Sequence, residues 1–430
     1  MKKKVNRRMF MRRSLELSAL SAVTMSSLSD LTSVAEAQSR AQGNDNILVV
    51  VRLDGGNDVL NMLCPIEAGA EAAYRELRPN IAIPANSISQ LDNEVGLASE
   101  WSALMPFWDA NEMAIVHRVG YPEANQSHFE SMDIWSLAQR QIGLESRSWM
   151  GRLADVHRRD NPGPNGERFR VMGIGLWDSR GLSTNGTDNS PITLGALDEF
   201  SLSNNWSAGN DNQLRNEFAR AHHSMTSTVN QEGASIRNSF NSVYQALDTI
   251  SQVNSSYQSS VQYPESDLGW KLEEVAKVIQ GQIGTEVILT GTGGFDTHAQ
   301  QDQNLPDLAR GCAQALAAFR NDLIAMDMWN RTCIAVVSEF GRRNYENGST
   351  GTDHGHGNAV LLMGGRVNGG QTFGTAPTVS DLRDNEYLPY ETDFRAIIKS
   401  LIEDHLGYDP EPVVEELYTV GDNRYNLFNT

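Results

Sequence analysis

Runs of apolar residues, separated by polar and glycine-rich segments, dominate the pattern along this chain. Buried strands are predicted at 47–53, 113–119, 286–292, 333–339 and 359–365, with a weaker sixth at 168–175. Several of these runs are continuously apolar rather than alternating, which is typical of strands that helices cover on both faces. The pattern therefore predicts an α/β fold with a central, mostly parallel sheet.

The helical pattern is clearest between the third and fourth of these strands. Residues 305–330 place apolar side chains at helical spacing, so 286–339 is interpreted as a strand–helix–strand unit. A second amphipathic helix is predicted within 391–416 and is expected to pack on the core. The segment at about 200–265 is rich in Asn, Ser and Gln, and we interpret it as a helical insertion peripheral to the sheet. The adjacent His222 and His223 are expected to be exposed there.

Residues 1–37 have the features of an export signal. A basic start precedes a modestly apolar stretch, and Arg7 to Met11 resembles the twin-arginine motif, although an ordinary secretory signal remains the alternative. Small residues at Ala35 and Ala37 predict cleavage after Ala37. The apolar stretch is shorter than the ~20 residues of a spanning helix, so no stable membrane insertion is expected. Residues 38–430 are then expected to form a single domain in the periplasm or outside the cell, exported folded by the twin-arginine machinery.

The charge of the chain limits its partners. The chain has 35 Lys and Arg and 54 Asp and Glu, and residues 1–37 hold seven of the basic and three of the acidic residues. A net charge of about −23 therefore remains on residues 38–430, which argues against nucleic acid as a partner. The three cysteines are too few for a disulfide framework. The sequence leaves the oligomeric state open.

Four polar clusters lie at or near the ends of predicted strands, where ligands gather in open α/β sheets. In the first cluster, Asp54 directly follows a strand and precedes two glycines, so it is a candidate metal ligand or a turn residue that caps a helix. In the second cluster, Ser127 and His128 precede a predicted helix. Ser127 is therefore a helix cap or a nucleophile that the free N–H groups of the helix would assist.

The third and fourth clusters carry acids and histidines among glycines. Asp296 and His298 follow the strand at 286–292, and both can face one metal only on the irregular backbone that the glycines permit. The fourth cluster contains Glu339, Asp353, His354 and His356, and in an extended segment the last two imidazoles point the same way. Carboxylates and imidazoles together suit one or two divalent ions, with zinc, manganese, magnesium, iron and calcium as candidates.

These motifs resemble the DUF1501 family of exported proteins, which is placed by similarity in the alkaline phosphatase/sulfatase superfamily. The resemblance extends from about residue 47 to 365 and is carried by "VRLDGGNDVLNMLCP", "SHFESMDIW", "WMGRLAD", "GGFDTHAQQ", "VVSEFGR" and "GTDHGHGNAVLLMGG". The resemblance implies an alkaline-phosphatase-like α/β/α sandwich that holds one or two metals.

Matched in order, the resemblance assigns roles to individual residues. Asp54 is similar to the early ligand, and Ser127 to the nucleophile. The later ligands are matched by Asp296, His298, Glu339, and His354 or His356, with Asp353 as a possible replacement. Two features depart from the superfamily: Phe340 stands where a histidine is usual, and the spacing of Asp296 and His298 is short.

The resemblance implies a metal-dependent hydrolase of small or polymeric phosphate or sulfate esters. His128 is then a ligand or the general acid. Arg342 is a candidate for holding an oxygen of the phosphate or sulfate, with a surface salt bridge as its alternative role. The competing hypothesis is a non-catalytic exported protein that keeps this fold and binds a metal or a partner. Phe340 and the polar insertion motivate that hypothesis.

Overall fold

The structure is a computed structural model of the chain, and it describes residues 45–123, 125–139, 147–160, 169–176, 192–198, 249–414 and 424–429. The predicted export signal and the pair His222 and His223 lie outside the described residues. Most of the predicted insertion at about 200–265 also lies outside them, and its described end is helical at 249–256.

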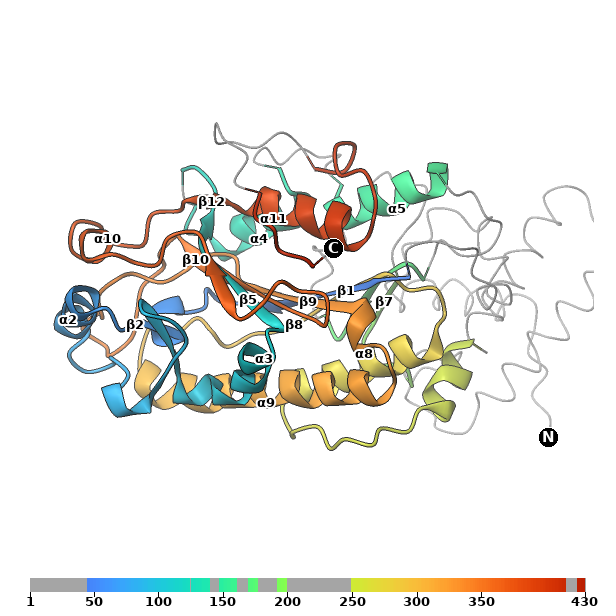
Figure 1. Cartoon of the computed structure of the whole chain (residues 1–430), viewed down its shortest axis with the longest axis horizontal. Helices are drawn as coiled ribbons and strands as arrows, with labels where there is room; N and C mark the ends of the chain where they lie inside the picture. Colours follow the sequence, from blue (N-terminus) through green and yellow to red (C-terminus); the bar gives the residue numbers. More distant parts are fainter. Residues whose placement is uncertain are drawn as a thin grey trace, which may run out of the picture.

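A large sheet forms the centre of the described part (Figure 1). Its strand order is β11 (Gln371–Phe373), β5 (Met113–Gly120), β10 (Asn358–Met363), β9 (Thr332–Val337), β1 (Ile47–Leu53), β8 (Val287–Thr292), β6 (Val171–Ile174) and β7 (Ile192–Leu194), and β12 (Thr392–Asp393) pairs with β5. All pairs are parallel except the two that β10 makes with β5 and β9. The six predicted strands and the mostly parallel sheet are confirmed.

Helices cover both faces of this sheet, as the continuously apolar strands predicted (Figure 1). Within β1, Val49 and Val51 face a core with α3 (Met105–Asp109), α8 (Asp267–Gly281) and α9 (Gln301–Ala325). Leu48 and Val50 face the opposite core. That core contains α4 (His128–Leu137), α5 (Trp149–Asp160) and α11 (Phe394–Ser400), which a π-helical segment at Leu401–His405 continues. The result is an α/β/α sandwich.

Smaller elements lie at one end of the sandwich. A three-stranded sheet has the order β2 (Leu63–Pro65), β4 (Val95–Ala98), β3 (Ile88–Gln90). Helices α2 (Ala68–Leu77) and α10 (Val379–Arg383) contact each other beside it. Short 3₁₀ turns complete the described elements at Val59–Asn61, Ala85–Ser87, Ser99–Leu104 and Trp329–Arg331.

Two connections of the central sheet decide where the candidate loops meet. The predicted unit β8–α9–β9 is confirmed, but β1 lies between its two strands. The chain enters β10 without a crossover helix, so β10 is antiparallel to β9. The loop before β10 therefore lies at the edge where β1, β8 and β9 end. The candidate residues lie in the loops that follow these three strands, except for Ser127 and His128 at the start of α4.

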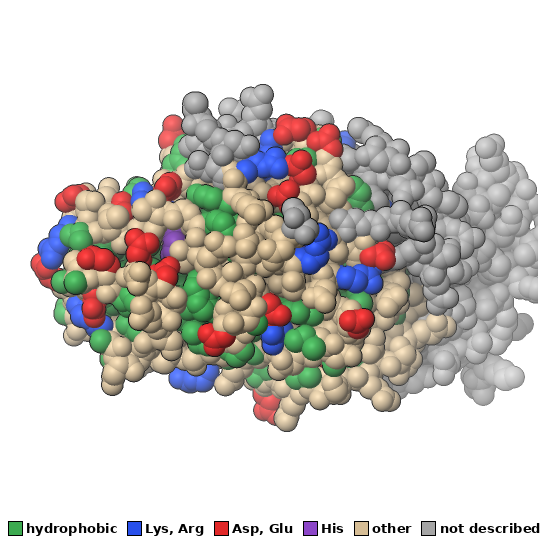
Figure 2. All heavy atoms as spheres, in the orientation of Figure 1, with side chains coloured by type: hydrophobic (Ala, Val, Ile, Leu, Met, Phe, Trp, Pro, Cys, Tyr) green, Lys and Arg blue, Asp and Glu red, His purple; other side chains and the backbone are tan. Residues whose placement is uncertain are grey.

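Among the described residues, no helix is both long and apolar enough to cross a membrane. On the face drawn in Figure 2, acidic side chains lie among basic ones, and the described residues form no continuous basic patch there.

Candidate metal centre

The loops at the carboxyl-terminal edge of the sheet approach each other closely. Asp54 follows β1 directly, and Asp296 comes four residues after the end of β8. Gly55 has a φ of +119°, and a Cβ atom there would lie 2.4 Å from the backbone nitrogen of Asp296. Glycine is therefore required for the contact between these two loops, since any side chain would push them apart.

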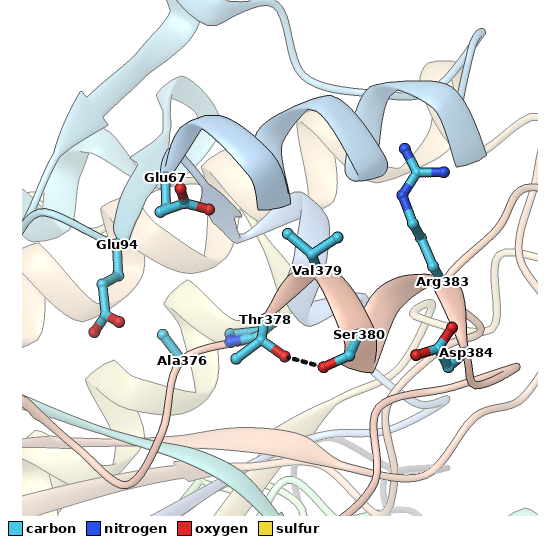
Figure 3. A pocket seen from close by; sticks show the side chains of 9 residues that line it. Glu67, Glu94, Ala376, Thr378, Val379, Ser380, Arg383 and Asp384 are labelled. Carbon is cyan, nitrogen blue, oxygen red and sulfur yellow. Dashed lines mark hydrogen bonds between the residues drawn. The ribbon is translucent and has the colours of Figure 1, made fainter.

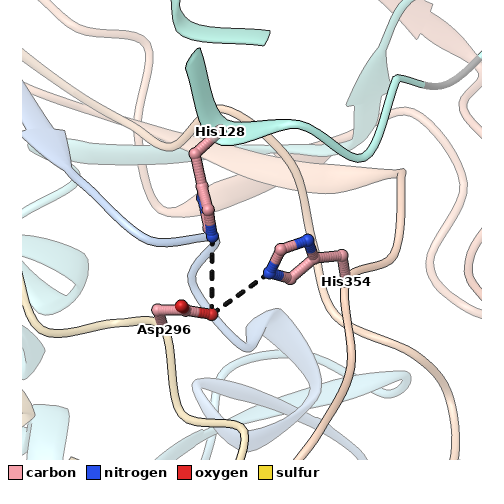
Figure 4. Close-up of side chains that lie close together, drawn as sticks. All are labelled: His128, Asp296 and His354. Carbon is pink, nitrogen blue, oxygen red and sulfur yellow. Dashed lines mark hydrogen bonds and ion pairs between the residues drawn. The ribbon is translucent and has the colours of Figure 1, made fainter. Parts of the chain in front are cut away.

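Three side chains from different elements converge at this edge (Figure 4). His128 begins α4, Asp296 follows β8, and His354 precedes β10. One ligand atom from each lies within 4.8 Å of the others. The Nε2 atoms of His128 and His354 lie 3.5 and 3.2 Å from Asp296 Oδ1. We call these three residues the cluster.

His298 lies beside the cluster at its exposed side. Its Nε2 atom is 3.0 Å from Asp296 Oδ1 and 2.9 Å from His354 Nε2. The His298 side chain is 45% exposed and that of Asp296 is 46% exposed, so this side of the site is open to solvent. The predicted proximity of Asp296, His298 and His354 is thus present in the fold.

The other nitrogen of each imidazole has an oxygen partner that can only accept. His128 Nδ1 is 2.7 Å from Glu339 Oε1, and His354 Nδ1 is 2.7 Å from the carbonyl of Gln126. His298 Nδ1 is 3.1 Å from Asp353 Oδ1. Because carboxylates and carbonyls accept hydrogen bonds, each Nδ1 carries a proton, and each Nε2 is left to bind either a cation or a second proton.

The residues of the cluster therefore fit a metal ion. Lone pairs on imidazole nitrogens point at a carboxylate oxygen, and acceptors facing acceptors require a proton or a cation between them. His128 Nε2 is buried and has no hydrogen-bond partner. An imidazole whose Nδ1–H is held by a carboxylate or carbonyl, with Nε2 turned inward, is also the usual arrangement of a metal-binding histidine.

Electrostatics support a cation at this position. Burial raises the pKa of Asp296, but the hydrogen bond and charge of Arg342 outweigh it and bring the pKa to about 2. The hydrogen bond to Glu339 raises the pKa of His128, whereas burial lowers the pKa of His354. The cluster thus keeps an ionised carboxylate at neutral pH, as a metal ligand requires.

Glu339 and Asp353, both predicted as ligands, instead orient the histidines. Glu339 is buried, and its oxygens accept from the backbone of Gly55, from His128 and from the hydroxyl of Ser338. Asp353 accepts from His298, and the Asn347 side chain, which also bonds it, lowers the pKa of Asp353. Oxygens of both carboxylates are therefore engaged by these partners.

Asp54 lies at the edge of the site and is bound to Arg52 at 3.0 Å. Burial raises the pKa of Asp54, and Arg52 opposes this effect. The nearby charge of Glu339 adds to the increase. Asp54 is therefore paired with a cation of the protein, and the described contacts do not join it to the cluster.

His356 differs from the prediction that it faces the same way as His354. Its ring is buried and lies near the rings of Tyr121, Tyr387 and Tyr390, with centroids 5.3 to 5.9 Å apart. The segment is no regular strand: His354 forms only an isolated bridge with Arg342, and Gly355 packs against the backbone of Arg342. Strand alternation therefore does not extend to His356.

Arg342 also departs from its expected role at the surface or on a substrate oxygen. Its side chain is fully buried. It donates to the carbonyls of Gly55, Gly56, Phe295 and Thr352. A further hydrogen bond of 2.6 Å goes to Asp296 Oδ1. With its nitrogens engaged in this way, the guanidinium fastens three loops and positions the Asp296 carboxylate.

Ser127 is the exposed N-cap residue of α4, immediately before His128. Its side chain makes no capping hydrogen bond, so the hydroxyl does not act as the helix cap that was the alternative to a nucleophile. The backbone of the adjacent Gln126 contacts His354. The hydroxyl therefore belongs to the loop that borders the cluster.

Phe340 occupies space beside the cluster. Its ring centroid lies 4.9 Å from the ring centroids of both His128 and His354. The ring also prevents any side chain at Gly56, where a Cβ atom would come within 2.5 Å of it. An apolar ring therefore stands where the resemblance implies a metal-binding histidine.

Two partners of the histidines were not anticipated from the sequence. The carbonyl of Gln126 leaves no trace in a sequence pattern, because every residue has one. Asn347, in "YENGS", has the pattern of an ordinary turn, yet its side chain contacts both Asp353 and the carbonyl of His298. Only its position opposite His298 in the fold gives it this role.

An open cleft of about 570 Å³ lies between α2 and α10, and the side chains around it are drawn in Figure 3. Its lining contains none of the predicted site residues among those that the structure describes. Glu67 caps α2, and Arg383 pairs with Glu76. These groups serve local helix ends, so the cleft is distinct from the metal site.

The fold and this edge site define an α/β protein with a candidate metal centre. The model of the DUF1501 family, described as a protein of unknown function, matches residues 275–414. This match confirms the resemblance to that family over the segment with β8, β9, β10 and the loops that carry Asp296 and His354.

Solved structures with a similar arrangement are sulfatases and members of the alkaline phosphatase superfamily. A sulfatase from Pseudoalteromonas sp. has 11% identity, a TM-score of 0.34, and coverage of 88% of this chain and 70% of its own. A protein of the alkaline phosphatase superfamily from Vibrio parahaemolyticus has 8% identity and a TM-score of 0.29, and the match covers 82% of this chain and 69% of that protein. A lipoteichoic acid synthase from Listeria monocytogenes has 8% identity and a TM-score of 0.33, and the match covers 88% of this chain and 80% of that protein. No curated protein sequence matches. These low values do not establish a common activity.

Proposed function

We propose that this protein is an exported, metal-dependent hydrolase of phosphate or sulfate esters. The observation that carries the proposal is the convergence of His128, Asp296 and His354, together with the hydroxyl of Ser127, which directly precedes His128 and makes no capping hydrogen bond. This combination places a candidate nucleophile directly before one of the candidate metal ligands, His128, and metal-assisted ester hydrolysis uses both kinds of group.

We assign one divalent ion to the cluster. Two imidazoles and one carboxylate are the donors of many catalytic zinc sites, and they suit manganese or iron as well. Magnesium and calcium prefer sites made of oxygen atoms, so they fit this donor set less well. The ring of Phe340 beside His128 and His354 supports a single ion in place of two.

The residues of the chain would divide the work around the ester. When bound, a divalent ion supplies Lewis acidity, which offsets negative charge on the transferring group. Ser127 offers its hydroxyl as the nucleophile. The N–H groups at the start of α4 receive no bond from the Ser127 side chain, and we assign to them the stabilisation of negative charge that develops on the phosphate or sulfate.

We assign proton transfer to His298. Its side chain is the most exposed of the three imidazoles in the site, so it can exchange protons with solvent and reach a leaving oxygen. Asp353 holds its Nδ1 and keeps Nε2 turned toward the site. His128, the earlier candidate for this role, is held by Glu339 with Nε2 buried in the cluster, which suits a ligand.

A non-catalytic protein that binds a metal or a partner is the second candidate. The buried and fully engaged Arg342 favours it, because no arginine is left at this position to hold an anionic substrate. In that case the cluster would serve as a structural metal site, and no ester would be turned over.

Turnover of aryl phosphate and aryl sulfate esters separates the two candidates. The purified protein, loaded with zinc or manganese, is compared with Ser127→Ala and with Ser102→Ala as a matched exposed serine. The hydrolase proposal predicts a rate loss of at least about 1,000-fold for Ser127→Ala and none for Ser102→Ala. No turnover by the metal-loaded parent on any ester would favour the second candidate.

A further inference from the structure

The buried side chain of Gln301, in the first turn of α9, is one of the groups that join the loops with Asp296 and His354. Gln301 is 1% exposed. Its Oε1 atom accepts hydrogen bonds from the hydroxyls of Thr297, at 2.8 Å, and Thr352, at 2.7 Å. Thr297 directly follows Asp296, and Thr352 lies two residues before His354. One amide oxygen therefore holds both loops.

The orientation of this amide is fixed from the opposite side. Gln301 Nε2 donates to the carboxylate of Asp58. Both oxygens of Asp58 accept from Arg78 Nη1, at 2.9 and 2.7 Å, and both residues are buried. Because a carboxylate only accepts hydrogen bonds, the NH₂ group of Gln301 must face Asp58, and its oxygen must face the two threonines.

Arg78 extends the same network to a third loop. Its Nε and Nη2 atoms donate to the carbonyls of Asn344 and Arg343, at 2.9 and 2.6 Å, in the loop that follows Glu339. The network therefore connects the segments after β1, β8 and β9 without contacting the cluster itself. Buried networks in which every member is paired rigidify their surroundings, and an unpaired member there is costly.

Arg342 joins the same two loops from the side of the cluster, through Phe295, Asp296 and Thr352, so Gln301 acts together with it. Gly293 and Gly294 precede Asp296, and Gly351 and Gly355 flank the segment with His354. Glycine gives a loop wide backbone freedom, so side-chain bonds help to fix the separation of the two ligand segments. Backbone bonds also join them: the N–H of Thr352 donates to the carbonyl of Thr297, at 3.1 Å, and the N–H groups of Gln300 and Gln301 donate to the carbonyls of Ser349 and Thr350, at 2.9 and 2.8 Å.

We propose that Gln301 is a positioning residue for the candidate metal centre. Its amide sets the distance between the Asp296 loop and the His354 loop, and Asp58 with Arg78 sets the orientation of the amide. The effect on metal binding rests on the function proposed above. The effect on the two loops is a property of the metal-free fold and can be measured without a metal.

The central variant is Gln301→Met, which keeps the side-chain length and removes every hydrogen bond of the amide. The matched control is Asp322→Asn on the same helix. Asp322 is also buried, and it accepts from the hydroxyls of Tyr257 and Tyr263. At 1.5 Å per residue it lies ~30 Å further along α9.

Two measurements are made on the purified full protein. In the metal-free state, hydrogen exchange of the Thr352 amide is expected to be about 10-fold faster in Gln301→Met than in the parent, and unchanged in Asp322→Asn. Zinc affinity, measured by competition with a chelator, is expected to fall ~10- to 100-fold in Gln301→Met and to stay within about twofold in Asp322→Asn.

A charge-conserving exchange tests the orientation of the amide. In Asp58→Asn combined with Gln301→Glu, the amide and the carboxylate trade places, and the threonine hydroxyls still have an acceptor. This pair is expected to recover most of the slow exchange at Thr352, whereas Gln301→Glu alone does not, because it sets two carboxylates against each other.

Unchanged exchange at Thr352 in folded Gln301→Met would overturn the proposal. If that variant does not fold, Thr352→Val removes one of the two hydroxyl bonds and is held to the same criterion. Faster exchange in a protein whose parent binds no zinc would uphold the role of Gln301 in the loops and contradict the metal-dependent function instead.

Discussion

Two groups of histidines in this fold have opposite surroundings. His128, His298 and His354 are partly exposed, and their Nε2 atoms converge on the carboxylate of Asp296. His117 and His356 are buried, and burial lowers the pKa of each to about 4. His354 and His356 are only one residue apart and yet belong to different groups.

The comparison shows that the partners of a histidine, and not its place in the sequence, decide its chemistry. In the first group, Glu339, Asp353 and the carbonyl of Gln126 each hold an Nδ1–H, which leaves Nε2 available to a cation. In the second group, aromatic rings surround His356, and neither it nor His117 has a partner for Nε2. These histidines stay neutral and contribute volume to the core.

The largest expected difference between the groups is in metal affinity. His354→Ala removes one of three ligands and is expected to weaken zinc binding by more than the ~10- to 100-fold that the loss of an outer hydrogen-bond partner costs. His356→Gln, next but one in the chain, should bind zinc within about threefold of the parent. Chelator competition measures both, and equal losses in the two variants would erase the distinction.

The next effect concerns the number of ions. Phe340→His replaces the ring beside His128 and His354 by a smaller imidazole, which adds a nitrogen ligand next to Glu339. We expect the number of tightly bound divalent ions to rise from one to two. Native mass spectrometry counts them, and Phe340→Leu is the control that opens space without adding a ligand. A parent that already holds two ions would refute the blocking role of Phe340.

The buried group predicts a loss of stability in acid. The pKa of His117 is 6.5 in the unfolded chain and about 4 in the fold, so the unfolded state takes up the proton first as the pH falls. The stabilising effect is complete above pH 6.5 and is lost toward pH 4. For one such histidine the free energy of unfolding should drop by about 2 kcal/mol from pH 7 to pH 5.

Urea unfolding at these two pH values tests this account. His117→Leu should show a pH-dependent drop that is smaller than that of the parent by about this amount. An identical drop in parent and variant would mean that His117 is protonated in the folded state at pH 5, in conflict with its burial.

A smaller effect is expected from the residues that orient the cluster. Glu339→Gln weakens the hydrogen bond to His128 and is expected to lower zinc affinity ~10-fold. Glu274→Gln is the matched control, since Glu274 is equally buried and accepts from the backbone of Leu197, away from the cluster. A loss of more than 100-fold in Glu339→Gln would indicate that Glu339 is itself a ligand.

The strands were predictable because their apolar runs are long and rich in β-branched residues. The proximity of Asp296, His298 and His354 followed from their position after or before strands that end at one edge. The antiparallel direction of β10 was not predicted, because an apolar run has the same pattern in either direction. It matters here, since it brings the segment with His354 back to the edge where β8 and β9 end.

Other parts of the site depended on contacts that a sequence does not contain. Spacing alone placed His356 with His354, but the close packing of Gly355 on Arg342 interrupts the alternation. Arg342 has the pattern of an exposed cation, and only the convergence of three loops makes it a buried donor. Gln301 looked like an ordinary residue at a helix start, and its role depends on two threonines that lie 4 and 51 residues away.

The most direct test is the metal content of the purified protein, prepared without chelators or a histidine tag. We predict one tightly held divalent ion per chain, removed by His354→Ala and retained by His356→Gln. A protein that holds no ion, and takes up none when zinc is added, would contradict the central claim that His128, Asp296 and His354 form a metal centre.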